Sequence, residues 1–349
     1  MFNIREKETA MKRTVLTLLM LCLILLSTPS LSHAVFRVEV LQAGKLDIYE
    51  ETYQGIIAGF EKNGFTPGKD LVITRTVIDD TDGEEVYTWN NLKYLMQIKT
   101  SSAEIIARKP DLAITIGTYA TRYARSRFVK AGIPLVFTCV SMPEMAGCPS
   151  KTEGGPGVTG VSIYTDPADI IRIAKEGMPG INKIGIILSD EITALACTED
   201  VRSKASAQGI EVVAKQLNLW ERITPAAEEM ISQGVDAFYI PVDRYYRVKD
   251  YNRAKELIRL CFDRKLPCLS SAIPAVKGSL IQASPDFHAV GILTADQATM
   301  ILNNGVKPET ISIAHTPGRS ISIDSEASRK LGIEIHVRAP GRAGRRTSS

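Results

Sequence analysis

The sequence predicts an α/β fold of two doubly wound parallel-sheet lobes joined by a hinge. Short β-rich runs alternate with helical stretches over most of the chain. The runs are continuously apolar, which is typical of parallel strands that helices cover on both faces. The alternation starts again after the Gly/Pro-rich stretch EGGPG at 153–157. Two successive strand–helix series with such a hinge between them indicate two lobes.

The first series contains four predicted strands. They are FRVEVLQ (36–42), DLVITRTV (70–77), DLAITIG (111–117) and IPLVFTC (133–139). After the first strand, apolar side chains recur with the spacing of one helix face, and these are Tyr53, Ile56, Ile57 and Phe60. Gly64 suits the C-terminal cap of that helix. Further helices are expected over 85–107 and from Thr118 onward.

The second series contains five predicted strands, each separated from the next by a helix. They are GVTGVSIY (157–164), INKIGIILS (181–189), IEVVAKQL (210–217), VDAFYIPV (235–242) and KLPCLSS (265–271). The tail at 341–349 is basic and poor in apolar residues, so we expect it to be disordered.

The segment 1–34 is predicted to be a cleavable signal peptide. Lys12 and Arg13 precede an apolar run of roughly 12 residues, and Ser32-His33-Ala34 forms a small-x-small cleavage site. The run is short for a membrane-spanning helix, which needs about 20 residues. We therefore expect a periplasmic protein, and an uncleaved membrane anchor is the alternative.

The cysteines leave several interpretations open. Cys22 lies within the signal peptide, so five of the six cysteines remain and at least one has no partner within the chain. Disulfides form in oxidising compartments outside the cytoplasm. Cys139 could be a nucleophile paired with His288, one half of a disulfide with Cys148, or a loop residue beside a ligand. Cys261 falls on an apolar helix face, which favours a core position.

Composition and motifs exclude several classes of function. The formal net charge of +3 is close to balanced, which argues against a dedicated nucleic-acid surface. The histidines after the signal peptide have no partner at i+4, and there is no Cys-x-x-Cys, so the sequence predicts no metal site. It also lacks a Gly-x-Ser-x-Gly elbow, a phosphate loop and a dinucleotide fingerprint. We therefore expect no enzymatic activity and no cofactor.

The candidate site residues follow the predicted strands, because ligands in open α/β sheets bind beyond the carboxyl ends of the strands. Thr118 would cap a helix whose first free amides favour an anion, although capping without a ligand explains it equally well. Asp243 directly follows the strand 235–242, and SDEITA at 189–194 follows another strand. The candidate ligand-binding residues are Gln42, Tyr49, Thr118, Tyr119, Ser141, Asp243, Arg244 and Tyr245.

The order of several stretches resembles one family of proteins. They are GIIAGFEKNGFTPGKDLVI, RKPDLAITIGTYAT, IPLVFTCVSMPEMAG, GVTGVS, VDAFYIPVDR, VGILTADQATMILNNGVKPETI and SIDSEASRKLGIEI. The chain is similar to the ABC-transporter substrate-binding proteins of the type I periplasmic-binding fold, whose relatives include binders of aromatic amino acids. The resemblance implies two lobes joined by three crossovers, with a ligand in the cleft. The first lobe would be 35–156 plus 285–307, and the second 157–284 plus 308–340.

The resemblance also implies roles for the candidate residues. Thr118 and Ser141 would hold a ligand carboxylate, and Asp243 would hold an ammonium group. The tyrosines that would pack on the ligand side chain are Tyr49, Tyr119 and Tyr245. Arg244 stands where the family usually has Asn, and Tyr119 and Met142 also depart from the family pattern. An Arg beside the cleft leaves room for a second acidic group on the ligand.

The function implied by the resemblance is capture of a small polar ligand and its delivery to an ABC importer. The ligand would be an amino acid or a related carboxylate, and the partner would be a transporter permease in the inner membrane. We expect a monomer with no nucleic-acid partner. A periplasmic input module for a signalling receptor is the alternative, because it would use the same pocket. The identity of the ligand stays open.

Overall fold

The computed structural model describes residues 35–79, 87–272, 276–315 and 320–335. The predicted signal peptide and the basic tail lie outside these ranges. In the described part, no helix is both long and apolar enough to cross a bilayer.

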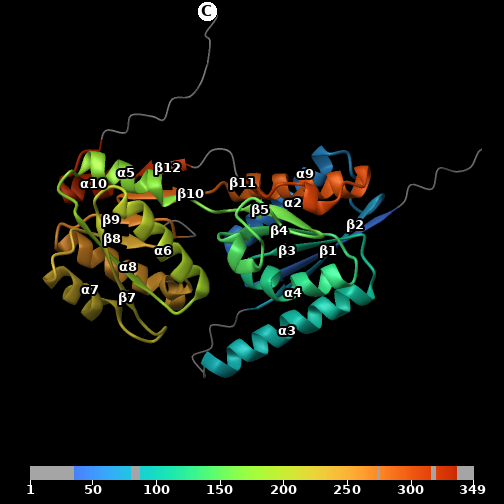
Figure 1. Cartoon of the computed structure of the whole chain (residues 1–349), viewed down its shortest axis with the longest axis horizontal. Helices are drawn as coiled ribbons and strands as arrows, with labels where there is room; N and C mark the ends of the chain where they lie inside the picture. The colour runs from blue at the N-terminus through green and yellow to red at the C-terminus, as the bar shows by residue number, and fades with distance from the viewer. Residues whose placement is uncertain (1–34, 80–86, 273–275, 316–319, 336–349) are drawn as a thin grey trace, which may run out of the picture. The chain divides into compact units, whose positions relative to one another are not determined.

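The first sheet has the strand order β11-β5-β4-β3-β1-β2, and its strands are parallel (Figure 1). The strands are β1 (Phe36–Ala43), β2 (Leu71–Ile78), β3 (Leu112–Ile116), β4 (Leu135–Val140), β5 (Val158–Ser162) and β11 (Ala314–His315). Every residue of β3, β4 and β5 is buried. This burial explains why these strands read as continuous apolar runs in the sequence.

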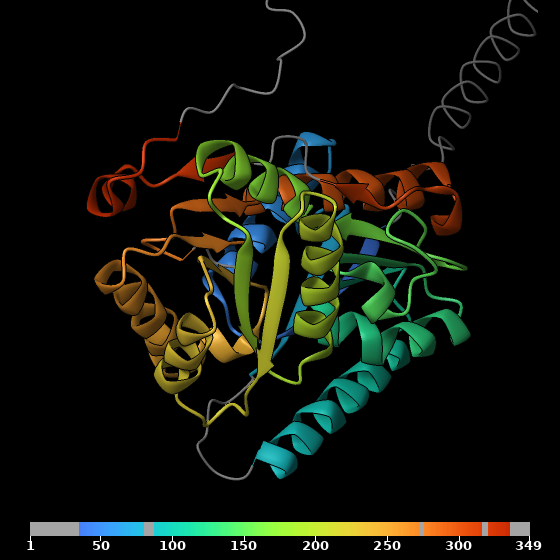
Figure 2. The same ribbon diagram turned by 60° about the vertical axis from the view of Figure 1, so that its left-hand side comes forward.

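Helices cover both faces of the first sheet. The helices α2 (Asp47–Lys62) and α9 (Phe287–Asn304) pack together on one face, where Val40 and Val136 point (Figure 1). The helices α3 (Tyr87–Ala107) and α4 (Thr118–Lys130) contact each other and cover the other face, where Leu41 and Phe137 point (Figure 2). Alternate side chains of one strand therefore enter two separate cores.

The second sheet has the order β12-β10-β9-β8-β6-β7, and only β12 is antiparallel to its neighbour among the described strands. The strands are β6 (Lys183–Leu188), β7 (Glu211–Gln216), β8 (Ala237–Ile240), β9 (Cys268–Ser270), β10 (Ile281–Ser284) and β12 (Ser320–Ile323). We call this sheet with its helices the second lobe, and the first sheet with its helices the first lobe. The predicted fold class of two parallel-sheet α/β lobes is confirmed.

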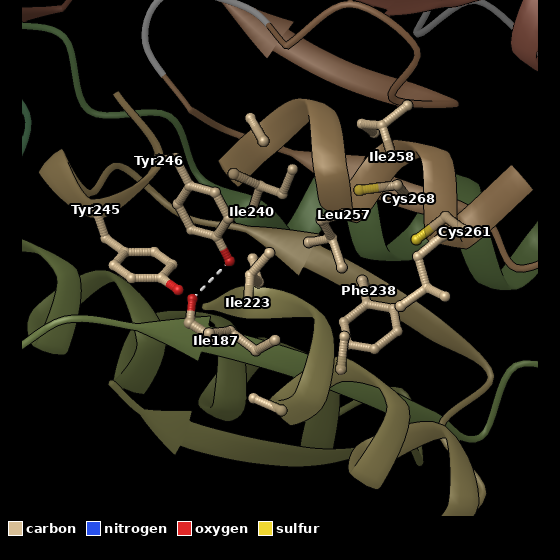
Figure 3. Packing of buried hydrophobic residues seen from close by; sticks show 14 of the residues in the cluster. Ile187, Ile223, Phe238, Ile240, Tyr245, Tyr246, Leu257, Ile258, Cys261 and Cys268 are labelled. Carbon is tan, nitrogen blue, oxygen red and sulfur yellow. Dashed lines mark hydrogen bonds between the residues drawn. The ribbon is translucent and has the colours of Figure 1, made fainter. Parts of the chain in front are cut away.

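The second sheet is also covered on both faces. One face packs on α5 (Pro167–Gly177), α6 (Ile192–Ser206) and α10 (Ser325–Leu331). The other face packs on α7 (Ile223–Ser232) and α8 (Val248–Asp263), and Figure 3 shows the core between them. Three short 3-10 turns complete the described elements, and they are η1 (Pro143–Ala146), η2 (Arg244–Tyr246) and η3 (Pro308–Thr310).

Strand pairing differs from the predicted lobe ranges at two places. β5 follows residue 156, yet it pairs with β4 in the first sheet. β11 follows residue 308, yet it pairs with β5. The Gly/Pro-rich stretch 153–157 is therefore a connection within the first sheet. The backbone is closely packed in this stretch, because an added Cβ on Gly154 would lie 2.2 Å from the carbonyl oxygen of Val158. The other predicted boundaries stay a proposal.

Two glycines allow the close contact between α2 and α9. A Cβ added to Gly55 would lie 2.2 Å from the carbonyl oxygen of His288, and one added to Gly291 would lie 2.1 Å from that of Thr52. Neither backbone oxygen can move without displacing its helix. α9 follows β10 of the second sheet directly in the chain, so this contact fixes a segment that returns from the second lobe.

Replacing Gly55 by alanine should lower the free energy of unfolding by about 1–3 kcal/mol, because the added methyl group must push the two helices apart. Urea denaturation followed by circular dichroism measures the change. Gly180→Ala is the control, since a Cβ there meets nothing within 4 Å and its effect should stay within about 0.5 kcal/mol. Equal stabilities of the two variants would contradict the tight contact.

Candidate functional site

A cavity in the described part is lined by both lobes, beyond the carboxyl ends of the strands. Its empty space is about 750 Å³, counting the part that is open to solvent. We call the lining residues of the first lobe the first wall, and they are Ala43, Leu46, Ile48, Tyr49, Tyr94, Thr118, Tyr119, Cys139, Ser141 and Ile163. We call those of the second lobe the second wall, and they are Glu191, Thr193, Val242, Asp243, Arg244 and Arg247.

The turn from β3 into α4 forms one part of the first wall. The N-cap of α4 is Gly117 and not the predicted Thr118, which is the first residue of the helix. Gly117 has a φ of 96°, a conformation that side chains disfavour. An added Cβ would also lie 2.8 Å from the hydroxyl of Tyr49. Glycine is therefore required here, and it lets Tyr49 approach the start of α4, where Thr118 and Tyr119 line the cavity.

A bulge at the end of β4 forms the next part of the first wall. The register with β5 shifts between Phe137 and Val140, and Cys139 has a left-handed φ of 56°. Such bulges redirect the side chains that follow them. Ser141, the residue after the strand, is buried and lines the cavity together with Cys139.

The thiol of Cys139 does not suit nucleophilic chemistry. Burial raises its pKa to about 12, and it hydrogen-bonds to the hydroxyl of Thr52 at 3.2 Å. Cys139 and Cys148 are both free thiols, and they belong to the apolar clusters on opposite faces of the first sheet. Of the three interpretations of Cys139, the structure therefore favours a residue beside the cavity, although Cys139 lies within β4 and not in the loop that follows it.

Asp243 organises the second wall. Its carboxylate accepts hydrogen bonds from the amide and the hydroxyl of Ser189, both at 2.7 Å, and from the amide of Tyr245 at 2.8 Å. Burial nonetheless raises the pKa of Asp243, because the residue is only 5% exposed. Asp243 therefore lies at the cavity, as its position after β8 suggests, and it also caps the turn η2.

Glu191 stands beside Asp243 in the same wall. Its carboxylate accepts a hydrogen bond from the backbone amide of Arg244 at 2.8 Å. Burial raises the pKa of Glu191, and the nearby charge of Asp243 raises it further, while Arg244 and Arg247 oppose the shift. The wall thus holds two acids and two arginines, so its formal charges balance.

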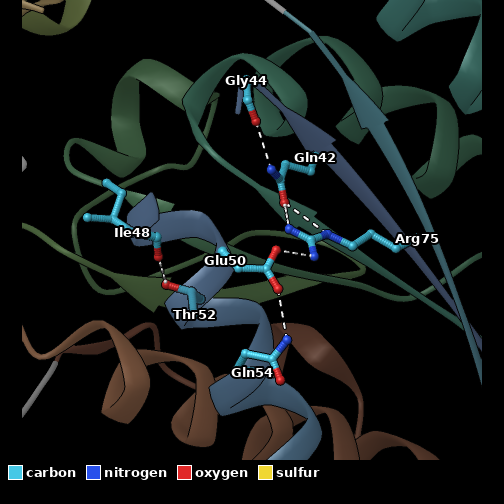
Figure 4. Close-up of polar contacts among 7 residues, drawn as sticks. All are labelled: Gln42, Gly44, Ile48, Glu50, Thr52, Gln54 and Arg75. Atoms are coloured by element: carbon cyan, nitrogen blue, oxygen red, sulfur yellow. Dashed lines mark hydrogen bonds and ion pairs between the residues drawn. The ribbon is translucent and has the colours of Figure 1, made fainter. Parts of the chain in front are cut away.

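Two predicted site residues do not line the cavity. Gln42 lies within β1, where its amide donates to the carbonyl of Gly44 at 2.7 Å and accepts from Arg75 at 2.6 Å (Figure 4). Arg75 also forms an ion pair with Glu50 at 2.7 Å, so this network ties β1, β2 and α2 together. Tyr245 is fully buried in the core of the second lobe (Figure 3).

The structure brings the other six predicted residues to the cavity, and these are Tyr49, Thr118, Tyr119, Ser141, Asp243 and Arg244. Sequence reasoning missed Tyr94, Glu191 and Arg247 as site residues. The stretch SDEITA after a strand was a signal for Glu191. Tyr94 lies in the middle of α3 and reaches the cavity beside Tyr119, with ring centroids 6.0 Å apart. Nothing in the local sequence marks that contact.

The described residues contain no group of three or more His, Cys, Asp or Glu side chains that could hold a metal ion. The cavity instead combines hydroxyl groups, two acids, two arginines and three tyrosine rings. Such a mixture can bind a small amphipathic molecule that carries charges of both signs.

Comparisons with known proteins give a consistent family. A family model described as ABC transporter substrate binding protein matches residues 37–344. No curated protein matches the chain. A ligand-free, open substrate binding protein with adhesive properties from Clostridium difficile is 21% identical, with a TM-score of 0.69 over 87% of this chain and 97% of that one.

Two further solved structures of similar fold contain ligands. An ABC domain from Streptococcus pneumonia in complex with L-Trp is 21% identical, with a TM-score of 0.68 over 87% of this chain and 96% of that one. A solute binding protein from R. palustris in complex with 4-hydroxybenzoate is 14% identical, with a TM-score of 0.59 over 79% of this chain and 82% of that one. At these identities the likeness concerns the fold.

Replacing Asp243 by asparagine should lower the free energy of unfolding by about 1–3 kcal/mol at neutral pH. The new amide group would direct a donor toward the donors of Ser189 or Tyr245 and leave a buried group unpaired. Urea denaturation measures the loss. The exposed neighbour Asp190 supplies the control variant Asp190→Asn, which should change stability by less than about 0.5 kcal/mol. An unchanged stability of Asp243→Asn would show that the three hydrogen bonds contribute little.

Proposed function

Because the chain belongs to the ABC transporter substrate binding protein family, we propose that it captures an amino acid or a related carboxylate in the cavity and delivers it to an ABC importer. One observation carries this proposal. The first wall of the cavity presents hydroxyl groups, and the second wall presents carboxylates. A zwitterion presents one charge to each wall.

The first wall suits the carboxylate of the ligand. Thr118 and Ser141 supply hydroxyl donors, and Thr118 begins a helix of 13 residues, α4, whose first amides have no partner within the helix. The partial positive charge at a helix N-terminus favours an anion. Ser141 is buried, so a hydrogen bond that it donates is shielded from water.

The second wall suits the ammonium group. Asp243 already accepts three protein hydrogen bonds, whereas Glu191 accepts one, from the backbone amide of Arg244, and can accept more. Burial raises the pKa of both carboxyls. An ammonium group between them would favour their charged forms and offset the cost of burial.

The tyrosines and arginines of the cavity can contact the rest of the ligand. Tyr49, Tyr94 and Tyr119 line the first wall and can pack on an apolar or aromatic side chain. Arg244 and Arg247 can pair with a second acidic group. Structures of this fold with L-Trp and with 4-hydroxybenzoate hold ligands that combine a ring with a carboxylate.

We propose binding without turnover, export by the segment 1–34, and action as a monomer with a permease in the inner membrane. The pKa of Cys139, raised to about 12, supports the absence of a thiol nucleophile in the cavity. An input module for a signalling receptor would use the same cavity. Uptake of the ligand in a strain that lacks the partner permease distinguishes the two roles, since only transport needs the permease.

A thermal-shift screen of the common amino acids and their des-amino carboxylates on the mature protein should find a stabilising amino acid. A ligand at 100 times its dissociation constant stabilises the folded state by about 2.7 kcal/mol. The amino acid that binds best should bind more tightly than its des-amino form, because the second wall then has a cation to pair with. A flat profile over all the compounds would contradict the proposal.

Replacing Glu191 by glutamine should weaken binding of that amino acid by about 2–5 kcal/mol, as for one partner of a buried charge pair. Binding of the des-amino form should change much less, because it has no ammonium group. Titration calorimetry with both ligands measures the difference, and Glu176→Gln on the exposed surface of α5 is the control. Equal losses for both ligands would remove Glu191 from the ammonium site.

Export should remove residues 1–34. Mass spectrometry of the protein recovered from the periplasm should find Val35 at the amino terminus. An intact amino terminus in the membrane fraction would contradict the proposed cleavage.

A further inference from the structure

Two cysteines outside the cavity lie together in the core of the second lobe. Cys261 is on α8 and Cys268 begins β9, and both belong to the apolar cluster between the second sheet and α8 (Figure 3). Their exposed fractions are 2% and 1%. Both are free thiols in the structure, and neither takes part in the proposed binding site.

The backbone between the two cysteines has a defined geometry. The amide of Leu266 donates to the carbonyl of Cys261 at 2.9 Å, and the amide of Lys265 donates to that of Phe262 at 3.2 Å. Lys265 has a left-handed φ of 56°. These are the features of a Schellman motif, which ends a helix and turns the chain sharply. The turn therefore holds the start of β9 close to the last turn of α8.

The register of the sheet directs the side chain of Cys268 toward α8. Cys268 pairs with Phe238 in parallel register, and both side chains enter the cluster that contains Cys261. The next residue, Leu269, enters the cluster on the opposite face of the sheet. A hydrogen bond to the thiol of Cys268, together with burial, raises the pKa of Cys261 well above its usual value. The two thiol groups are thus direct neighbours.

We propose that Cys261 and Cys268 form a disulfide in the exported protein. This proposal rests on the proposed export. The two thiols give two electrons and two protons to the disulfide of an exchange partner, through a mixed disulfide, and the partner leaves as two thiols. The bond forms during folding, before α8 packs on the sheet, because the thiols of the folded protein are buried. It then links the end of α8 to β9.

The other cysteines provide internal controls. Cys139 and Cys148 lie in clusters on opposite faces of the first sheet, and Cys139 hydrogen-bonds to Thr52. Cys197 lies on α6 and belongs to none of the apolar clusters that contain the other four described cysteines. We therefore expect these three thiols to stay reduced in the same molecules.

Trypsin places Cys261 and Cys268 on different peptides, so a peptide map tests the proposal without any variant. The protein is recovered from the periplasm, denatured with N-ethylmaleimide and digested without reductant. Peptide 260–264 should be linked to peptide 266–277, and a reductant should separate them. Peptide 131–151 should carry the maleimide on both of its cysteines, and peptide 184–202 on its one. Maleimide on both 260–264 and 266–277 would overturn the proposal.

A second sample separates this proposal from the proposed export. The full chain is reduced, denatured and refolded with a mixture of oxidised and reduced glutathione, and then mapped in the same way. If the protein is absent from the periplasm, export fails and this sample alone decides the pairing. Formation of the linked peptides supports the pairing, and its absence overturns it. Cys261→Ser is the control, because it should leave Cys268 labelled by the maleimide and abolish the linked peptides.

Discussion

The covering of both faces of each parallel sheet is the constraint on which the rest of this structure depends. Val40 and Leu41 are adjacent in β1, yet they enter two different cores. In the part of the chain that the structure describes, neither sheet then leaves a face free for a ligand, and the polar groups collect where strands end. The cavity follows from this rule, because strand ends from both lobes line it. Glycine at 117 and the bulge at Cys139 set the local direction of the chain there.

The polar groups of the second wall hold one another in place before a ligand arrives. Asp243 is fixed by Ser189 and by the amide of Tyr245, and Glu191 is fixed by the amide of Arg244. Side chains that are already ordered lose little entropy on binding, which improves affinity. Burial raises the pKa of both acids. The hydrogen bonds and positive charges within the protein therefore do not fully compensate for the cost of burying each carboxylate. In the proposed function, a cationic group on the ligand would supply that compensation.

The sequence predicted the strands and the rule that the site follows them, because buried parallel strands leave a plain apolar signal. It could not predict which way each side chain turns. Gln42 lies one residue inside β1 and pairs with Arg75 of the neighbouring strand. Tyr245 lies in a turn that Asp243 caps, and its ring enters the core. The stretch 153–157 looked like a boundary between lobes, whereas the strand after it pairs back into the first sheet, because strand pairing is not local.

The contacts that join the lobes beside the cavity are one apolar contact, made by Val242, and polar contacts around Asp200. Each buried apolar cluster in the described part is built on one sheet, and the partly buried Val242 is a side chain that packs across. The hydroxyl of Tyr164 donates to Asp200 at 2.6 Å, and Lys151 lies 3.7 Å from the same carboxylate. Partly exposed ion pairs of this kind contribute about 0–1 kcal/mol. A ligand that contacts both walls adds its own interactions to each lobe, so its binding free energy also favours the association of the lobes.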